Sequence, residues 1–240
     1  MPNFVRSTVQ NIWIRYYFKF VLSKIKSTEI DGIKLDLTSL SLKVRNRILI
    51  GYEEAEKHIC REFLSKDDCV LELGGGIGFI GLFCQKRLGI EKYVTIEANP
   101  QTIQLLERNY SLNGLIPQVL NYAISSAGGS VDLNVGGDFW EHCLTPKSKA
   151  AKTISVPAIT LPELLERIPI QPNTLIIDVE GGERFINFRE IPEEITKIII
   201  EIHPVIIGRA AVQELINSLC ERGFRIVCEE GDTLAFTKGC

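Results

Sequence analysis

The spacing of apolar positions changes along the chain and predicts alternating strands and helices. Short apolar runs that predict buried strands lie at 70–73, 93–97, 174–179 and 198–202, with a shorter one near Val119. Apolar residues three and four apart predict helices at 79–87, 100–112 and 210–222. Because strands connected through helices run parallel, we expect an α/β fold with a doubly wound, mostly parallel sheet.

Turn signals add two hairpins to this pattern. Segments 224–228 and 233–236 flank the turn Glu230-Gly231-Asp232, which predicts an antiparallel hairpin at one end of the sheet. Near the amino terminus, Asp31-Gly32 predicts a turn between two short strands, and 52–64 predicts a helix with one apolar face.

Residues 1–28 differ in character from the rest of the chain. They contain no Asp or Glu, are rich in aromatic residues, and carry the cations Arg6, Arg15, Lys19, Lys24 and Lys26. Because Arg15 and Lys19 interrupt the apolar run, we expect neither a signal peptide nor a membrane span. The segment predicts a helical extension that packs on its own domain, joins a homodimer, lies on an anionic membrane surface or covers the site. Residues 29–240 are expected to form one domain.

A long polar segment at 125–155 separates the two halves of the predicted sheet. Loops of this length usually carry function. Within it, Asp138, Trp140, Glu141 and His142 bring aromatic, acidic and imidazole groups together. Trp140 and His142 are therefore candidates for contact with a polar, ring-shaped substrate such as a sugar, and a surface flap explains the segment equally well.

Net charge and the distribution of cysteines limit the classes of partner and the cellular compartment that we expect. The 240 residues include 27 basic and 30 acidic side chains, which gives a net charge of -3, so we do not expect a nucleic-acid partner. The seven cysteines are scattered and form no CxxC pair, which argues against a zinc site or a redox dithiol. A reduced, cytoplasmic location is expected, with a peripheral membrane position open through residues 1–28.

The glycine-rich stretch after the first parallel strand is the clearest functional signal. Glu72 ends the apolar run and is followed by Gly74, Gly76 and Gly78. Glycines let the backbone approach a ligand closely, and the amides at the following helix start can bind its negative end. Glu97, at the end of the next strand, can accept both hydroxyl protons of a ribose. The pattern predicts a cofactor that contains a nucleoside.

Two cofactors fit this stretch. Gly76-Ile-Gly78-Phe-Ile-Gly81 satisfies the GxGxxG pattern of an NAD-dependent reductase. However, Glu72 would face a pyrophosphate with like charge, whereas it can accept the amino group of a methionine-type cofactor. S-adenosylmethionine therefore suits Glu72 and Glu97 better.

The chain resembles the FkbM-like group of class I S-adenosylmethionine methyltransferases, from about Gly51 to the carboxyl terminus. The resemblance rests on the motifs Gly51-Tyr52-Glu53, the glycine loop at 72–78, Glu97-Ala-Asn99-Pro100 with Leu106, Asn109 and Asn113, Asp178-Val-Glu180-Gly181-Gly182-Glu183, and Glu201-Ile-His203-Pro204. The chain departs from the family in its first loop, where Glu72-Leu-Gly-Gly-Gly-Ile-Gly78 replaces Asp-x-Gly-Ala-Asn-x-Gly.

This resemblance implies a Rossmann-like sheet of seven strands, with the cofactor across the carboxyl ends of the strands. It also implies methyl transfer to a hydroxyl, since similar proteins act on sugars, glycolipids and polyketide-like natural products. By position, Glu97 would hold the ribose, Asn99 would lie beside it, and the backbone of Ala123 would lie near the adenine.

A second polar cluster is expected at the carboxyl ends of the strands at 174–179 and 198–202. Asp178 and Glu180 are two residues apart, as are Glu201 and His203, so each pair faces one side if the chain is extended. His203 is the best candidate for the base that removes the acceptor proton, with Glu180 or Asp178 as alternatives. Glu201 is a candidate for substrate contact.

Other roles remain open for this cluster. His203 could instead fix the turn at Pro204, and Asp178 could hold the cofactor's amino group. These groups could also bind Mg²⁺ or Mn²⁺, although the sequence does not predict a metal. The leading hypothesis is an O-methyltransferase that acts on a small molecule or glycan, and the alternatives are an NAD-dependent reductase and a degenerate binding protein.

Overall fold

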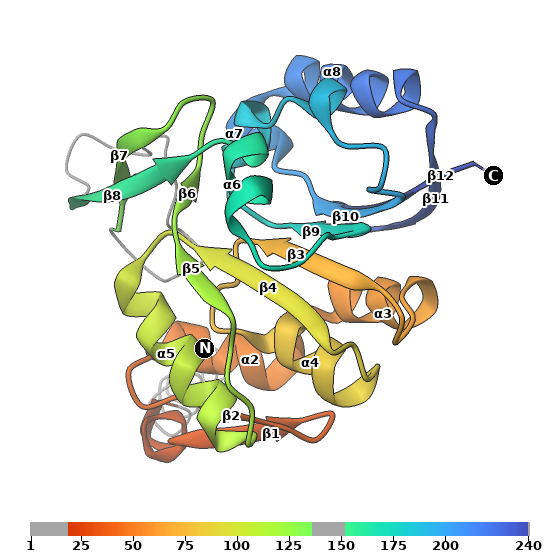
Figure 1. Cartoon of the computed structure of the whole chain (residues 1–240). Coiled ribbons are helices and arrows are strands. Elements are labelled where there is room, and N and C mark those ends of the chain that lie inside the picture. Colours follow the sequence, from red (N-terminus) through yellow and green to blue (C-terminus); the bar gives the residue numbers. More distant parts are fainter. Residues whose placement is uncertain (1–18, 136–151, 240) are drawn as a thin grey trace, which may run out of the picture. The chain divides into compact units, whose positions relative to one another are not determined.

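The computed structural model describes residues 19–135 and 152–239. The chain divides into two compact units, residues 1–52 and 53–240, and Figure 1 shows the elements of both. The first unit therefore extends past the 1–28 segment that the sequence sets apart, of which residues 1–18 lie outside the described part. Among the described residues, no helix is both long and apolar enough to cross a bilayer.

The described part of the first unit contains helical residues at 19–24, which lie within the predicted amino-terminal extension, followed by a small hairpin and helix α2 (Leu42–Gly51). Strands β1 (Ser27–Ile30) and β2 (Ile33–Asp36) pair antiparallel. Asp31 and Gly32 connect them with positive φ angles of 50° and 77°, which confirms the predicted turn. The predicted helix at 52–64 is observed as α3 (Glu54–Phe63) of the second unit, and a separate helix α2 (Leu42–Gly51) precedes it.

The second unit is built on a seven-stranded sheet in the order β11-β12-β10-β9-β3-β4-β5. The strands are β3 (Cys69–Leu73), β4 (Lys92–Glu97), β5 (Val119–Asn121), β9 (Thr174–Ile177), β10 (Lys197–Glu201), β11 (Phe224–Glu230) and β12 (Thr233–Lys238). Strand β12 pairs antiparallel with both of its neighbours, while the other pairings are parallel. The mostly parallel sheet and its terminal hairpin are therefore confirmed.

Helices cover both faces of this sheet (Figure 1). They are α3, α4 (Phe79–Arg87), α5 (Pro100–Leu112), α6 (Leu161–Arg167), α7 (Pro204–Ile207) and α8 (Arg209–Glu221). Leu71 and Leu73 of β3 share one core with Leu164 of α6 and Leu219 of α8. Since side chains alternate along a strand, Glu72 points to the opposite face, toward α4.

A separate three-stranded sheet corrects the loop expected at 125–155. Strands β6 (Ala123–Ile124), β7 (Gly129–Asn134) and β8 (Thr153–Ile159) form it in the order β6-β8-β7. Strand β7 could not be predicted from the sequence, because its residues are largely polar or exposed and show no alternation of apolar positions. Residues 136–151 between these strands lie outside the described part.

Strand order brings the predicted site residues to one edge of the large sheet. Strands β3, β9 and β10 are parallel neighbours, with Leu73 opposite Ile177 and Ile177 opposite Ile200. Their carboxyl ends, and that of β4 beside β3, therefore meet at the same edge. This is the position at which open α/β sheets bind ligands.

Candidate functional site

The glycine loop lies between β3 and α4 and is held by the neighbouring backbone. The amides of Gly74 and Gly75 both donate to the carbonyl oxygen of Ile96, at 3.0 Å each. Gly74 has a φ of +94°, and a Cβ added there would lie 1.7 Å from the carbonyl oxygen of Asp178. Only glycine fits such an approach. The loop after β3 therefore contacts the residue that follows β9.

A buried side chain of α5 fixes the far part of this loop. The Nδ2 atom of Asn109 donates to the carbonyl oxygen of Ile77 at 2.8 Å, and Asn109 is fully buried. Sequence reasoning singled out Asn109 only as part of a family motif. Because Asn109 and Ile77 are 32 residues apart in the chain, the sequence gave no sign of this contact, which holds the loop in one shape.

Glu97 accepts hydrogen bonds from the same loop. One carboxylate oxygen accepts from the amide of Gly76 at 3.0 Å, and the other from the amide of Asn99 at 2.8 Å. Burial raises the pKa of Glu97 to about 7, although these amides favour its charged form. A carboxylate has roughly four acceptor positions, so Glu97 can still accept hydroxyl protons from a ligand.

Glu72 does not lie in the loop but beneath α4. Its side chain is buried, its Oε2 has no hydrogen-bond partner, and a Cβ on Gly81 would lie 3.5 Å from that oxygen. Burial raises the pKa of Glu72 to about 7, against the opposing effect of the nearby Thr95 and Tyr93 hydroxyls. This position does not support the predicted contact of Glu72 with the amino group of a cofactor.

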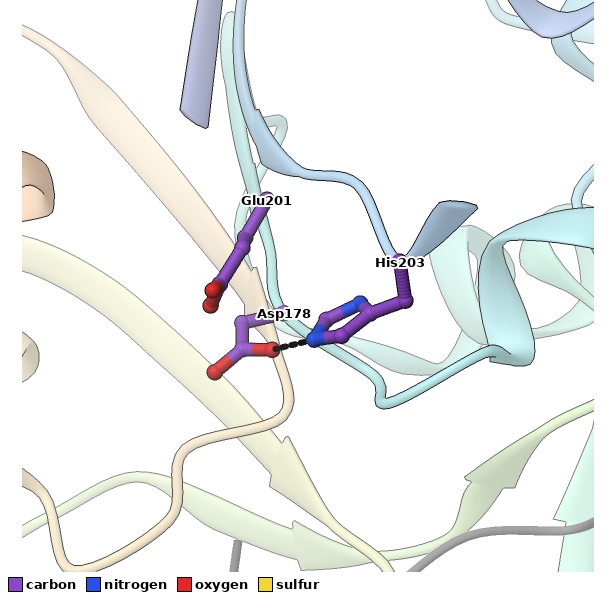
Figure 2. A group of neighbouring side chains, drawn as sticks. All are labelled: Asp178, Glu201 and His203. Carbon is purple, nitrogen blue, oxygen red and sulfur yellow. Dashed lines mark ion pairs between the residues drawn. The ribbon is translucent and has the colours of Figure 1, made fainter. Parts of the chain in front are cut away.

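The second predicted cluster forms at the carboxyl ends of β9 and β10. The Nε2 atom of His203 lies 3.7 Å from Asp178 Oδ1 and 3.7 Å from Glu180 Oε2. Figure 2 shows Glu201 pointing toward the same space as Asp178 and His203. The four groups that the sequence placed together are thus brought together by the pairing of two adjacent parallel strands.

Glu183 is a site residue whose role sequence reasoning missed. In the sequence it is named only within a family motif; in the structure it lies in the first turn of a short 3-10 helix (Gly182–Phe185), and its fully buried carboxylate lies 2.5 Å from His203 Nδ1. This contact fixes the orientation of the imidazole ring and leaves Nε2 facing Asp178 and Glu180. The local signal was the acidic residue in a glycine-rich turn, and the partner lies 20 residues away in the chain.

Crowding of carboxylates shifts the pKa values of the cluster. Burial and the charge of Glu201 raise the pKa of Asp178. Burial also raises the pKa of Glu201 to about 7. Burial lowers the pKa of His203, but its hydrogen bond to Glu183 and the surrounding carboxylates outweigh burial and raise it. The cluster therefore favours states in which it holds a proton or another positive charge.

The backbone that carries Glu180 is in an uncommon conformation. Glu180 has a φ of 47° and Gly181 a φ of 92°, and left-handed backbone is rare for residues other than glycine. A Cβ on Gly181 would lie 2.5 Å from Cγ2 of Ile206 in α7. The turn after β9 is thus held against the segment after β10, which keeps Glu180 beside His203.

Comparison with known proteins identifies the family of this chain. The model of the methyltransferase FkbM domain matches residues 72–226, which includes the glycine loop, Glu97 and the cluster at Asp178 and His203. The chain belongs to the FkbM methyltransferase family. No curated protein matches this chain significantly.

Among the solved structures similar to this FkbM-family chain, one agrees with its fold. A methyltransferase from Pyrococcus furiosus is 12% identical, with a TM-score of 0.52 and coverage of 96% of this chain and 99% of that one. TYW2 from M. jannaschii, solved in complex with AdoMet, is 13% identical, with a TM-score of 0.43 and coverage of 88% and 82%. At such low identity, the first of these likenesses supports the fold alone.

The remaining predicted residues of the FkbM-family chain occupy different positions. Asn99 is buried, and its side chain accepts from the amide of Gln101 at the start of α5, so its side chain serves as a helix cap. Ala123 is buried in β6. Trp140 and His142 lie outside the described residues, and their contact with a substrate stays a prediction.

Proposed function

We propose that this FkbM-family protein transfers a methyl group from S-adenosylmethionine to a hydroxyl of a sugar, glycolipid or other small natural product. The observation that carries the proposal is the position of His203. Its ring is oriented by Glu183, it faces Asp178 and Glu180, and Asp178 contacts the glycine loop at Gly74. Asp178 thus lies between the proton acceptor, His203, and the predicted cofactor loop, and it contacts both.

The residues of the loop fit the cofactor. Glu97 would hold the ribose hydroxyls, because its carboxylate retains acceptor capacity beyond the amides of Gly76 and Asn99. Asp178, whose backbone lies against the loop at Gly74, would accept from the amino group of the methionine part through its other carboxylate oxygen. When bound, S-adenosylmethionine supplies an electrophilic methyl group on a positively charged sulfur.

An NAD-dependent reductase is the alternative that the glycine spacing allows. The expected repulsion between Glu72 and a pyrophosphate does not separate the two cofactors, since Glu72 lies beneath α4 and away from the loop. The family match over residues 72–226 favours methyl transfer instead.

The chain's own residues would supply alignment and removal of a proton. In the proposed arrangement, the acceptor hydroxyl lies against Asp178, Glu180 and His203. His203 Nε2 takes its proton, and the Glu183 carboxylate stabilises the imidazolium that results. General-base catalysis of this kind contributes typically 10²- to 10⁴-fold to a rate.

Calorimetry with S-adenosylhomocysteine and NADH tests the choice of cofactor. We expect saturable binding of S-adenosylhomocysteine and none of NADH. Binding of NADH alone would support the reductase, and binding of neither would support a degenerate binding protein. Transfer of labelled methyl groups to a panel of glycans and extracted metabolites then tests the acceptor class, and label on nitrogen or carbon alone would contradict O-methylation.

A further inference from the structure

Three side chains at the edge of the sheet present ligand atoms to one common point. Asp178 follows β9, Glu201 ends β10, and His203 lies two residues beyond Glu201. One carboxylate oxygen from each acid and a ring nitrogen of His203 all lie within 4.8 Å of one another. Figure 2 shows all three side chains converging from these two neighbouring strands.

The imidazole is prepared to act as a ligand. The contact between Glu183 and His203 Nδ1, at 2.5 Å, occupies that nitrogen and leaves Nε2 toward Asp178. Histidines that bind metals almost always donate their other ring N–H to a carboxylate or carbonyl, which fixes the tautomer. Glu183 is fully buried, so packing holds its carboxylate against the ring.

One carboxylate oxygen of Asp178 has an ion-pair contact with His203 but no hydrogen bond within the described part of the chain. Asp178 Oδ1 is shielded from solvent and has no hydrogen-bond partner among the described residues. It is the atom that lies 3.7 Å from His203 Nε2. A buried acceptor left without a partner is unfavourable by about 1–3 kcal/mol, and more when it is charged. A bound cation would satisfy it.

The surrounding charge also favours a cation. The carboxylates that act on Asp178 are those of Glu201, Glu53, Glu180 and Glu56, whereas His203 faces the same space with Glu183 already on its Nδ1. Carboxylates held this close repel one another. A divalent ion would offset this repulsion more effectively than one proton.

We propose that Asp178, Glu201 and His203 form a site for one divalent transition-metal ion, with Mn²⁺ as the best match to one nitrogen and two carboxylate ligands. Mixed nitrogen and oxygen ligands of this kind suit Mn²⁺ and Zn²⁺ better than Mg²⁺, which favours oxygen alone. Adjacent ligands on a six-coordinate ion with bonds of about 2.1 Å lie about 3 Å apart. Asp178 Oδ1 and His203 Nε2 lie 3.7 Å apart and all three ligand atoms lie within 4.8 Å of one another, so the side chains must move closer together when the ion binds.

The role of the ion in methyl transfer rests on the proposed function, whereas its binding does not. Three protein ligands leave positions open for the acceptor hydroxyl, which loses its proton more readily when it is bound to a cation. With Nε2 occupied, the proton passes to Glu180, whose Oε2 lies 3.7 Å from that nitrogen. The oxygen then forms its bond to the methyl carbon as the carbon–sulfur bond breaks, and that electron pair stays on sulfur.

Titration of the EDTA-treated full chain with Mn²⁺, followed by electron paramagnetic resonance without cofactor, tests the site. We expect one saturable site that Zn²⁺ displaces. Glu201→Gln and His203→Ala should each weaken Mn²⁺ binding at least about tenfold, and Glu183→Gln should weaken it less. Circular dichroism of each variant reports whether it is folded.

A second histidine and carboxylate pair provides a matched control. His58 Nδ1 contacts Glu230 Oε2 at 2.6 Å, and both side chains are exposed. His58→Ala should leave Mn²⁺ binding unchanged. Absence of a saturable site, binding that survives both Glu201→Gln and His203→Ala in folded protein, or binding lost in His58→Ala would overturn the proposal.

The outcomes also separate the ion from the methyl transfer. Saturable Mn²⁺ binding in a chain that methylates no hydroxyl would support the site and contradict the proposed function. Full methyl transfer in EDTA would support the proposed function with His203 as base and contradict the role of the ion in the reaction, whereas absence of saturable Mn²⁺ binding would contradict the site.

Discussion

The two polar regions at the edge of the large sheet are built on different principles. After β3 and β4, backbone amides satisfy the polar group, since Glu97 accepts from Gly76 and Asn99. After β9 and β10, side chains face side chains, and Asp178 Oδ1 is left without a hydrogen-bond partner. In the first region, the backbone therefore holds the Glu97 carboxylate in one position. The second holds excess negative charge and can take up a proton or a cation.

Removal of the imidazole should have the largest effect, because it should lower the rate of methyl transfer and leave cofactor binding intact. His203→Ala should lower the rate of methyl transfer by about 10²- to 10⁴-fold, whereas the affinity for S-adenosylhomocysteine should stay within about twofold. The reason is that the glycine loop and Glu97 do not depend on the imidazole. Single-turnover transfer of labelled methyl and calorimetry give the two readouts.

His58→Ala is the matched control for this change, because that histidine is also paired with a glutamate but is exposed. Glu180→Gln should reduce the rate in the same direction as His203→Ala. Wild-type rates in both His203→Ala and Glu180→Gln would refute a chemical role for the cluster.

A substitution at Gly74 tests whether the two regions depend on each other. Gly74→Ala places a methyl group 1.7 Å from the carbonyl oxygen of Asp178 and forces a non-glycine residue to a φ of +94°. We expect several kcal/mol of lost stability in urea unfolding, since overpacking costs about 1–3 kcal/mol and left-handed backbone about 1–2 kcal/mol.

Gly114 provides the control for backbone strain alone. It has a φ of +72° and nothing within 4 Å of an added Cβ, so Gly114→Ala should cost only about 1–2 kcal/mol. Equal losses in the two variants would mean that the loop and Asp178 are not in close contact.

Neutralisation of Glu72 should change how stability depends on pH. Burial raises the pKa of Glu72 to about 7 from the usual 4.5, so the folded state binds the proton more tightly than the unfolded state. Its contribution to stability is therefore fully present below pH 4.5 and is lost as the pH rises through 7. A shift of this size corresponds to roughly 3 kcal/mol.

Urea unfolding of Glu72→Gln and wild type at pH 5 and pH 8, without cofactor, measures this effect. The variant should gain stability relative to wild type as the pH rises. A difference that stays constant between these pH values, or that changes in the opposite direction, would show that Glu72 is solvated or paired.

The sequence predicted elements well wherever the apolar pattern was local. The helices at 79–87 and 100–112 are observed with the same bounds. Pro100 at the first helical position, after the cap residue Asn99, marks the second of these starts. The terminal hairpin followed from its turn residues. These features depend only on residues that are neighbours in the chain.

The contacts that define the site could be predicted only in part. The spacing of Asp178, Glu180, Glu201 and His203 placed them at two strand ends, and parallel pairing then brought them together. The contact of Glu183 with His203 depends on the turn at Gly181–Gly182, and the spacing of apolar residues does not predict the course of the backbone in that turn. Glu72 was expected in the loop, but strand alternation turned its side chain under α4.

The smallest of the expected effects concerns the ribose contact. Glu97→Ala removes a carboxylate that accepts from two amides and retains capacity for ligand hydroxyls. Because hydrogen bonds to a charged group contribute about 1.5–3 kcal/mol, binding of S-adenosylhomocysteine should weaken about 10- to 100-fold. The rate at saturating cofactor should change little, because His203 and Asp178 keep their positions. Glu91→Ala, at an exposed residue before β4, should leave both quantities unchanged. Loss of rate without loss of affinity in Glu97→Ala would reverse the division of roles between the two regions.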